Sequence, residues 1–285
     1  MKKKKVEVTT RSSDVLKRVI NVELAMLDNL SETKEVEKDN SKESVEKEEN
    51  KEEIELAKKE VKVEKVEERN IEPTYTLEYE GVKIKNQSSY KLTDEILKPD
   101  YLPKNCNDVL IFHTHTCESY TESEKYKYKM TGNYRTTDIN FSVARVGKEL
   151  KKQLEEYNFN VIHNTTLHDH PSYNGSYDKS LETVESILKK DKTIDIVIDL
   201  HRDAIGDNTY APTVKIGDEY CARIMFVIGT DGGGLEHSNW KQNLKIAVKI
   251  QEKANEMYPG LFRNINLRSA TFNQKVTNAA SIIEV

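Results

Sequence analysis

The strongest constraint on the fold is a regular alternation of short apolar runs with amphipathic segments from Asp108 to the end of the chain. Short apolar runs are typical of buried strands, and longer segments with apolar residues on one face are typical of helices. The pattern predicts five strands and three helices, in the order DVLIFHTH, NFSVARVGKELKKQLEEY, FNVIHNT, YDKSLETVESILKKD, IDIVIDLH, ARIMFVIGT, NWKQNLKIAVKIQEKANEMY and ASIIEV. We therefore expect an α/β fold, with an open, mostly parallel sheet and helices on both faces.

The chain before Asp108 divides into three segments. Residues 1–30 form an N-terminal tail with one predicted short helix. Residues 31–74 form a linker rich in Glu and Lys, whose first 40 residues hold 15 acidic and 10 basic side chains and no aromatic ring. Such a segment cannot offset the entropy of ordering, so we expect it to be disordered or transiently helical. Residues 75–107 form a short lead-in, where TLEYEGVKIKNQSSYKL alternates apolar and polar residues and predicts a hairpin or β segment.

The charge distribution gives no reason to expect nucleic acid as a partner. The formal net charge is -5, and residues 31–70 account for all of it, because the rest of the chain carries 34 acidic and 34 basic side chains. Nucleic-acid-binding domains usually carry a basic patch. The chain has no apolar run of about 18 residues and no signal-peptide core, so no membrane anchor is predicted within it.

Polar side chains follow three of the predicted strands. His113 and His115 follow VLIF, His201 follows IVIDL, and Glu284 follows SII. Sites in open α/β sheets gather at the carboxyl ends of the strands. A single histidine after a strand is more often a structural hydrogen-bonding residue, but imidazoles and a carboxylate at three strand ends favour a site.

The spacing of this cluster suits a metal ion. His115 and Glu118 form an H-x-x-E pair, and His201 from a distant strand would complete a His₂Glu set. Catalytic zinc commonly has such a set and leaves its fourth position to water. His113 would lie outside this set or exchange roles with His115, and the spacing leaves both alternatives open. His168 and His170, in HDHPSYNGSY, are interpreted as solvated turn residues rather than a second metal pair.

Several motifs in order resemble the stage II sporulation protein P family. They are VLIFHTHTCESY, DIVIDLHRDA, the segment IMFVIGT with the helix that follows it, and FNQKVTNAASIIEV, and they span Asp108 to Val285. The resemblance implies a peptidoglycan hydrolase of endospore-forming bacteria, with a fold like that of the zinc N-acetylmuramoyl-L-alanine amidases. It implies cleavage of the amide between muramic acid and the stem peptide, with an added endopeptidase activity on stem cross-links. Residues 108–285 would be the catalytic domain.

The resemblance also implies a setting for this activity. Peptidoglycan would be cleaved during engulfment, at the extracytoplasmic surface of the septal membrane in the cell envelope. The implied partners are a lytic transglycosylase, stage II sporulation protein D, and the membrane anchor protein M. The loop with Tyr173 and Tyr177 would then line a glycan groove.

The motifs assign roles residue by residue. The family pattern H-T-H-x-x-E-S falls on His113, His115 and Glu118, D-L-H-R-D contains His201 and Arg202, and I-E-V contains Glu284. Zn²⁺ would be held by His115, Glu118 and His201. In the related amidases the middle carboxylate opens the first long helix, where YRTTDIN has no glutamate; Glu118 therefore takes its place, with Asp138 as the alternative.

Two residues would carry the chemistry beside the ion. Glu284 would act as general base towards the attacking water. Arg202, or the metal, would hold the developing oxyanion. An equally weighted alternative for Arg202 is a salt bridge to Asp199 or Asp203.

Two departures from the family pattern bear on activity. Family members begin with a membrane anchor and continue past the I-E-V strand with a glycine and another helix, so we expect a C-terminally truncated domain in which Glu284 is poorly held. One alternative function is a non-catalytic module that binds or scaffolds the wall. A second is a zinc carboxypeptidase or deacylase, because H-x-x-E with a distant histidine suits those enzymes too.

Overall fold

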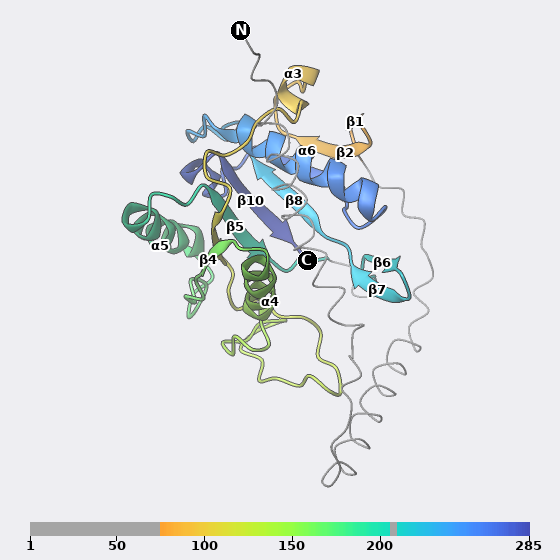
Figure 1. The fold of residues 1–285 in the computed structure, drawn as a ribbon. Helices are drawn as coiled ribbons and strands as arrows, with labels where there is room; N and C mark the ends of the chain where they lie inside the picture. Colours follow the sequence, from red (N-terminus) through yellow and green to blue (C-terminus); the bar gives the residue numbers. More distant parts are fainter. Residues whose placement is uncertain (1–74, 206–209) are drawn as a thin grey trace.

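A computed structural model describes residues 75–205 and 210–285. The predicted N-terminal tail (1–30) and charged linker (31–74) lie outside these ranges. The described chain builds one eight-stranded sheet, in the order β1-β2-β9-β8-β10-β5-β3-β4, and a separate two-stranded hairpin, β6-β7 (Figure 1). No helix within the described ranges is long and apolar enough to cross a membrane.

The elements follow one another along the chain with few long gaps. The strands are β1 (Leu77–Tyr79), β2 (Val82–Gln87), β3 (Asp108–Phe112), β4 (Asn160–His163), β5 (Ile196–His201), β6 (Thr213–Ile216), β7 (Glu219–Ala222), β8 (Met225–Gly229), β9 (Ile265–Arg268) and β10 (Ala279–Glu284). The helices are α3 (Asp94–Leu97), α4 (Val143–Glu156), α5 (Ser176–Lys190), α6 (Trp240–Met257) and the short η1 (Gln274–Val276). All five predicted strands and all three predicted helices are confirmed.

The sheet consists of two parallel blocks that meet at one antiparallel pair. Strands β10, β5, β3 and β4 run one way, β2, β9 and β8 run the other way, and β8 pairs with β10 antiparallel. The reversal has a simple cause. The described residues between β5 and β8 contain no helix, so β8 starts at the edge where β5 ends and runs back. Parallel neighbours, by contrast, need a crossover connection.

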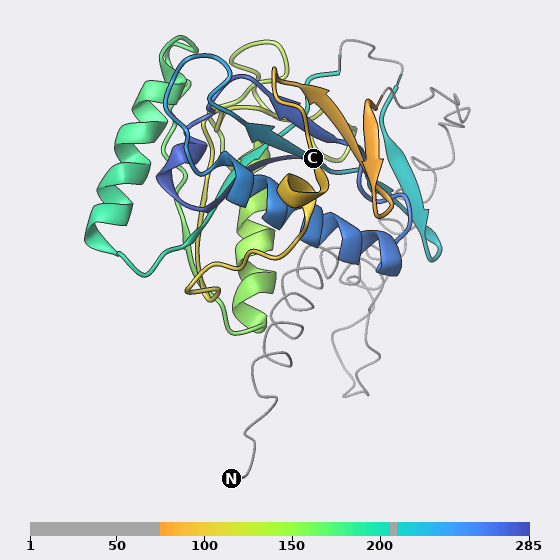
Figure 2. The same ribbon diagram turned by 90° about the horizontal axis from the view of Figure 1, so that it is seen from above.

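Helices cover both faces of the sheet, as the apolar pattern predicts. Along β3, Val109 and Ile111 pack with α4 and α6, whereas Leu110 and Phe112 pack with Val184 of α5. This alternation is the period of two that a strand imposes on its side chains. Figure 2 shows α5 standing apart from α4 and α6. The α/β class with a mostly parallel sheet is therefore confirmed.

The lead-in segment belongs to the same sheet. Strands β1 and β2 form the predicted antiparallel hairpin, with Leu77 opposite Ile84. Strand β2 then pairs parallel with β9, and the side chains of Val82 and Ile84 are fully buried in the main core. The elements that were not predicted are the β6-β7 hairpin, strand β9 and the short helices α3 and η1. The alternation in TVKIGDEYCA around a Gly-Asp turn was a usable signal for the hairpin.

Candidate functional site

The carboxyl ends of β3, β5 and β10 meet at one edge of the sheet and gather the predicted residues. Glu284 on β10 is the Cα partner of His201 on β5. Partners on neighbouring strands project from the same face of a sheet, so both side chains leave on the face that α5 covers. The turn after β3 adds His115, whose ring centroid is 5.3 Å from that of His201. Glu118 Oε2 is 3.6 Å from His201 Nδ1.

His201 is held by a buried carboxylate. Asp199 Oδ1 lies 2.9 Å from His201 Nε2, and Asp199 itself accepts hydrogen bonds from the amide and the hydroxyl of Thr114 at 2.8 and 2.7 Å. Burial lowers the pKa of His201, but the charge and hydrogen bond of Asp199, together with Glu118 and Glu284, outweigh burial and raise this pKa to about 10. The imidazole therefore sits in a strongly negative field.

Glu118 and Arg202 are linked through the backbone. The amide N–H of Arg202 donates to Glu118 Oε2 at 3.2 Å, and burial raises the pKa of the Glu118 carboxyl. The Arg202 guanidinium donates to the carbonyls of Asp203 and Tyr134 at 3.2 and 3.3 Å. The salt bridge considered for Arg202 is not formed, because Asp203 pairs with Arg263 at 2.7 Å and Asp199 contacts His201. The positively charged guanidinium thus lies next to the acidic cluster.

Glu284 is firmly positioned, so the expectation that it would be poorly held is wrong. Its strand lies between β5 and β8, where Glu284 pairs with both His201 and Met225. The pairing continues through Val285, whose amide donates to the His201 carbonyl at 3.1 Å. Burial, opposed by His201 and reinforced by Glu118, raises the pKa of the Glu284 carboxyl to about 7. A carboxyl with a pKa near 7 is suited to general acid–base chemistry at neutral pH.

His115 is enclosed by the loop that leads into α5. Its ring stacks on Tyr173 with centroids 4.4 Å apart, its Nε2 is 3.0 Å from the Tyr173 hydroxyl, and its Nδ1 is 3.3 Å from Ser176 Oγ. Burial, with the charge of His201, lowers the pKa of His115 to about 4. Arg135 stacks 5.2 Å from the Tyr173 ring and forms an ion pair with buried Asp169. A supporting layer thus holds Tyr173 against His115.

His113 lies on the other face of the sheet. Its Nδ1 donates to the Leu200 carbonyl at 2.7 Å, so its Nε2 accepts the proton of His163 Nε2 at 2.8 Å. Both ring nitrogens are used, and the side chain is fully buried against α4, where Gly147 lies. The structure therefore brings His115, and not His113, beside His201.

Three other residues considered from the sequence lie apart from the cluster. Asp138 is exposed, and its carboxylate accepts hydrogen bonds from the backbone and side-chain amides of Asn140. His168 is not a solvated turn residue as interpreted. It is buried, with Nδ1 donating to the His113 carbonyl at 2.8 Å and Nε2 2.9 Å from the Thr183 hydroxyl. His170 is exposed.

The residues fit a divalent cation in donor type and charge, although they do not form a closed set of ligands. Two atoms bound to a tetrahedral zinc lie about 3.3 Å apart, given bonds of about 2.0–2.1 Å, and His201 Nδ1 and Glu118 Oε2 are 3.6 Å apart. Asp199 on the far ring nitrogen is the partner that a metal-bound histidine usually has. His115, however, directs both nitrogens at Tyr173 and Ser176. Within the described residues, no three His, Cys, Asp or Glu side chains converge closely enough to hold an ion.

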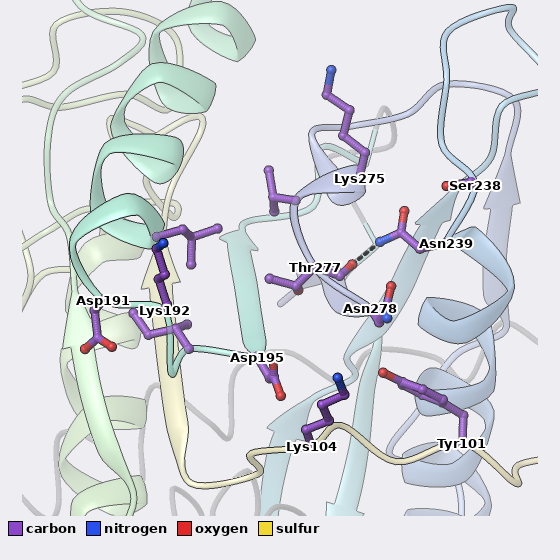
Figure 3. A pocket seen from close by; sticks show the side chains of 13 residues that line it. Tyr101, Lys104, Asp191, Lys192, Asp195, Ser238, Asn239, Lys275, Thr277 and Asn278 are labelled. Atoms are coloured by element: carbon purple, nitrogen blue, oxygen red, sulfur yellow. Dashed lines mark hydrogen bonds between the residues drawn. The ribbon is translucent and has the colours of Figure 1, made fainter.

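A separate hollow of about 500 Å³ lies at the opposite edge, before the amino ends of β5 and β10 (Figure 3). Its lining includes Lys104, Lys192 and Lys275. In Figure 3 the side chains of Lys104 and Lys275 lie on opposite sides of the hollow. Binding sites carry polar groups that converge on one point, and these lysines do not, so the candidate site remains the one at the carboxyl ends.

Sequence reasoning missed the layer behind His115. Arg135 and Asp169 are 34 residues apart and lie in loops, and no local pattern pairs them. Tyr120 was missed as well, although it follows Glu118 by two residues. Its side chain lines a small hollow next to the start of α4. Its position so close to Glu118 was the available signal.

The fold and the site together define an α/β protein with a buried histidine–carboxylate centre at the carboxyl ends of its parallel strands. The chain belongs to the Stage II sporulation protein P (SpoIIP) family, which it matches over residues 5–285. Stage II sporulation protein P of Bacillus subtilis (strain 168) is 28% identical over 187 residues, which are 62% of this chain and 44% of that protein. The chain thus covers less than half of that relative's length. No solved structure matches it. The family resemblance noted from the motifs is confirmed.

Proposed function

We propose that this protein is a zinc-dependent peptidoglycan hydrolase that cleaves the amide between N-acetylmuramic acid and L-alanine. The observation that carries the proposal is the cluster of half-buried Glu284 with buried Glu118 and His201 at the carboxyl ends of β5 and β10. Membership of the SpoIIP family supports the wall as substrate. The motif resemblance supports a role in engulfment at the cell envelope, beside stage II sporulation proteins D and M, and a further activity on stem cross-links.

Each residue has a role in this proposal. His115, Glu118 and His201 would hold the zinc, with Asp199 orienting His201. When bound, zinc supplies Lewis-acid polarisation of the amide carbonyl and makes water more acidic. Glu284 takes a proton from the attacking water and passes it to the leaving nitrogen, a task that its raised pKa suits. Arg202 offers positive charge towards the developing oxyanion.

The experiment is muropeptide analysis after incubation of purified sacculi with the full chain, with and without added zinc and a chelator. We expect zinc-dependent release of stem peptides that begin with alanine, while the glycan strands stay intact. Loss of only the terminal amino acids of the stems would point to a carboxypeptidase. Retention on sacculi without any product would point to a wall-binding module. Either outcome would overturn the amidase proposal.

A further inference from the structure

Exposed apolar side chains concentrate on one segment of the described chain. Of the ten large hydrophobic residues that are exposed, four lie between residues 120 and 139: Tyr120, Tyr126, Met130 and Ile139. Isolated exposed apolar residues are normal, but neighbouring ones mark interaction surfaces. This segment begins two residues after Glu118 and forms the yellow-green loop that extends below α4 in Figure 1.

The loop is long but tied together at its base. It carries no helix or strand between β3 and α4. The Ser119 amide donates to the Tyr134 carbonyl at 3.0 Å, and the Thr136 amide donates to the Cys117 carbonyl at 2.8 Å. Loops of this length without secondary structure are usually functional. Backbone hydrogen bonds at the base give the loop a defined shape, so its outward side chains form a preorganised surface.

A hollow of about 170 Å³ lies between this loop and the start of α4. Four of its ten lining residues are aromatic, with Tyr126 43% exposed and Tyr128 stacked on Phe141 at 6.0 Å between centroids. The Arg145 guanidinium lies 5.1 Å from the centre of the Tyr126 ring. Asn140 and Ser123 add polar groups. Ring faces with a few hydrogen-bonding groups are the usual lining of a small-molecule site.

The hollow lies next to Glu118 of the candidate active site. Tyr120 and Ser142 both line the hollow, and the amide of Val143, the residue after Ser142, donates to the Glu118 carbonyl at 2.7 Å. The Tyr120 carbonyl accepts a hydrogen bond from the Tyr128 hydroxyl at 2.7 Å, which ties Tyr120 to the rest of the loop. A ligand in the hollow would therefore lie close to the segment that carries Glu118.

The chemistry of the loop indicates what this ligand is. Lysines alternate with apolar residues in KYKYKM, residues 125–130, and Lys127 and Lys129 are exposed. Sugar rings present apolar faces that stack on aromatic rings, and their hydroxyls suit the amide and hydroxyl groups of the rim. The stem peptides attached to such a polymer carry carboxylates, which complement the lysines. A glycan strand with acidic peptides combines both features.

We propose that residues 120–141 form a glycan-binding platform, on which a sugar ring of the wall polymer stacks on Tyr126 next to the scissile amide. This inference rests on the proposed function, because that function supplies the polymer. It adds a residue-level reason why the protein would prefer polymeric glycan to isolated muropeptides.

Binding tests the platform without catalysis. In the full chain with Glu284→Gln, affinity is measured for glycan strands from which all stem peptides have been removed. Tyr126→Ala should raise the dissociation constant at least about fivefold, the order expected for truncating an aromatic anchor. Tyr126→Phe keeps the ring and should bind like the parent. Tyr220→Ala, which removes a 64% exposed tyrosine on β7, is the matched control and should also bind like the parent.

Two outcomes would overturn the platform. One is equal affinity of the Tyr126→Ala and parent proteins for peptide-free strands. The other is retention only on strands that keep their peptides, which would make the peptide the occupant. Hydrolysis then separates this inference from the proposed function. Tyr126-dependent binding without any peptide release would support the glycan-binding platform and contradict the proposed amidase activity. Amidase activity on sacculi with a KM that Tyr126→Ala leaves unchanged would sustain the amidase and overturn the platform.

Discussion

Glu284 and His201 stand side by side on neighbouring strands, as Cα partners where β10 runs parallel to β5. The carboxyl of one and the imidazole of the other leave the same face of the sheet. Because β10 is flanked on both sides, this relationship is set by backbone hydrogen bonds and not by loop packing. Sites built on strands hold their geometry better than sites built on loops, so substitutions at these two positions should give clear results.

Replacing Glu284 should remove catalysis without removing the metal. Glu284→Gln keeps the shape of the side chain but cannot accept a proton, so we expect amide cleavage to fall roughly 10²-fold or more, a typical scale for general acid–base catalysis. The measurement is the rate of peptide release from sacculi, with zinc content determined in the same preparation. Glu236→Gln, at an exposed position before α6, is the control. Parallel loss of zinc and activity would instead make Glu284 a ligand.

The metal set makes a separate prediction. We expect about one zinc ion per chain in the parent protein, the usual content of a His₂Glu site, and a large drop after His201→Ala, Glu118→Ala or His115→Ala. His170→Ala removes an exposed histidine and should leave the zinc content unchanged. Metal analysis of the purified variants tests this prediction, and full zinc occupancy in His201→Ala would rule out this ligand set.

The periodic part of the sequence predicted most of the fold. Strands and helices with strong apolar patterns were found because burial on one or both faces leaves a period of two or 3.6 residues. The antiparallel direction of β8 follows from the lack of a helix among the described residues between β5 and β8, which periodicity alone does not reveal. Strand β9 is only four residues long, Ile265–Arg268, and so short a run carries little pattern.

The site was harder to predict than the fold. Strict alternation would place His113 and His115 on the same face, but β3 ends at Phe112 and the chain turns over residues 114–117. The position of that turn cannot be predicted from residue spacing. The turn brings His115 next to His201, whereas His113 stays on the other face of the sheet. The contacts of Asp169 with Arg135, and of Arg135 with Tyr173, join loops far apart in sequence. Such contacts exist only once the fold has formed.

Gly147 of α4 should be intolerant of a side chain. A Cβ there would lie 2.6 Å from His163 Nε2 and 2.9 Å from the His113 ring. Alanine normally favours a helix by about 1 kcal/mol over glycine, but overpacking a core costs about 1–3 kcal/mol. We therefore expect Gly147→Ala to lower the free energy of unfolding, measured by denaturant titration. Lys148→Ala, at the next and exposed position of the helix, should change it little. A more stable Gly147→Ala protein would show that the imidazoles can move aside.

The His113–His163 pair should make stability depend on pH in a defined direction. Burial lowers the pKa of His113 to about 3 and that of His163 to about 4, from 6.5. Between about pH 6.5 and 4 the unfolded chain therefore binds more protons than the folded one at these two positions. Their contribution to stability is complete above about pH 6.5 and is lost as the pH falls through this range.

The variant His163→Gln isolates this effect from the other titrating groups. At pH 7 it loses the hydrogen bond to His113 Nε2 and should be less stable than the parent. At pH 5 the imidazole of His163 binds a proton in the unfolded parent but stays neutral in the folded parent, which costs folding free energy. Glutamine does not titrate, so the variant has no such cost. The stability difference between the two proteins should therefore shrink from pH 7 to pH 5. Denaturant unfolding at both pH values measures it, with His170→Gln as the control outside the pair. A difference that stays constant or grows as the pH falls would mean that His163 binds its proton in the folded protein as readily as in the unfolded chain.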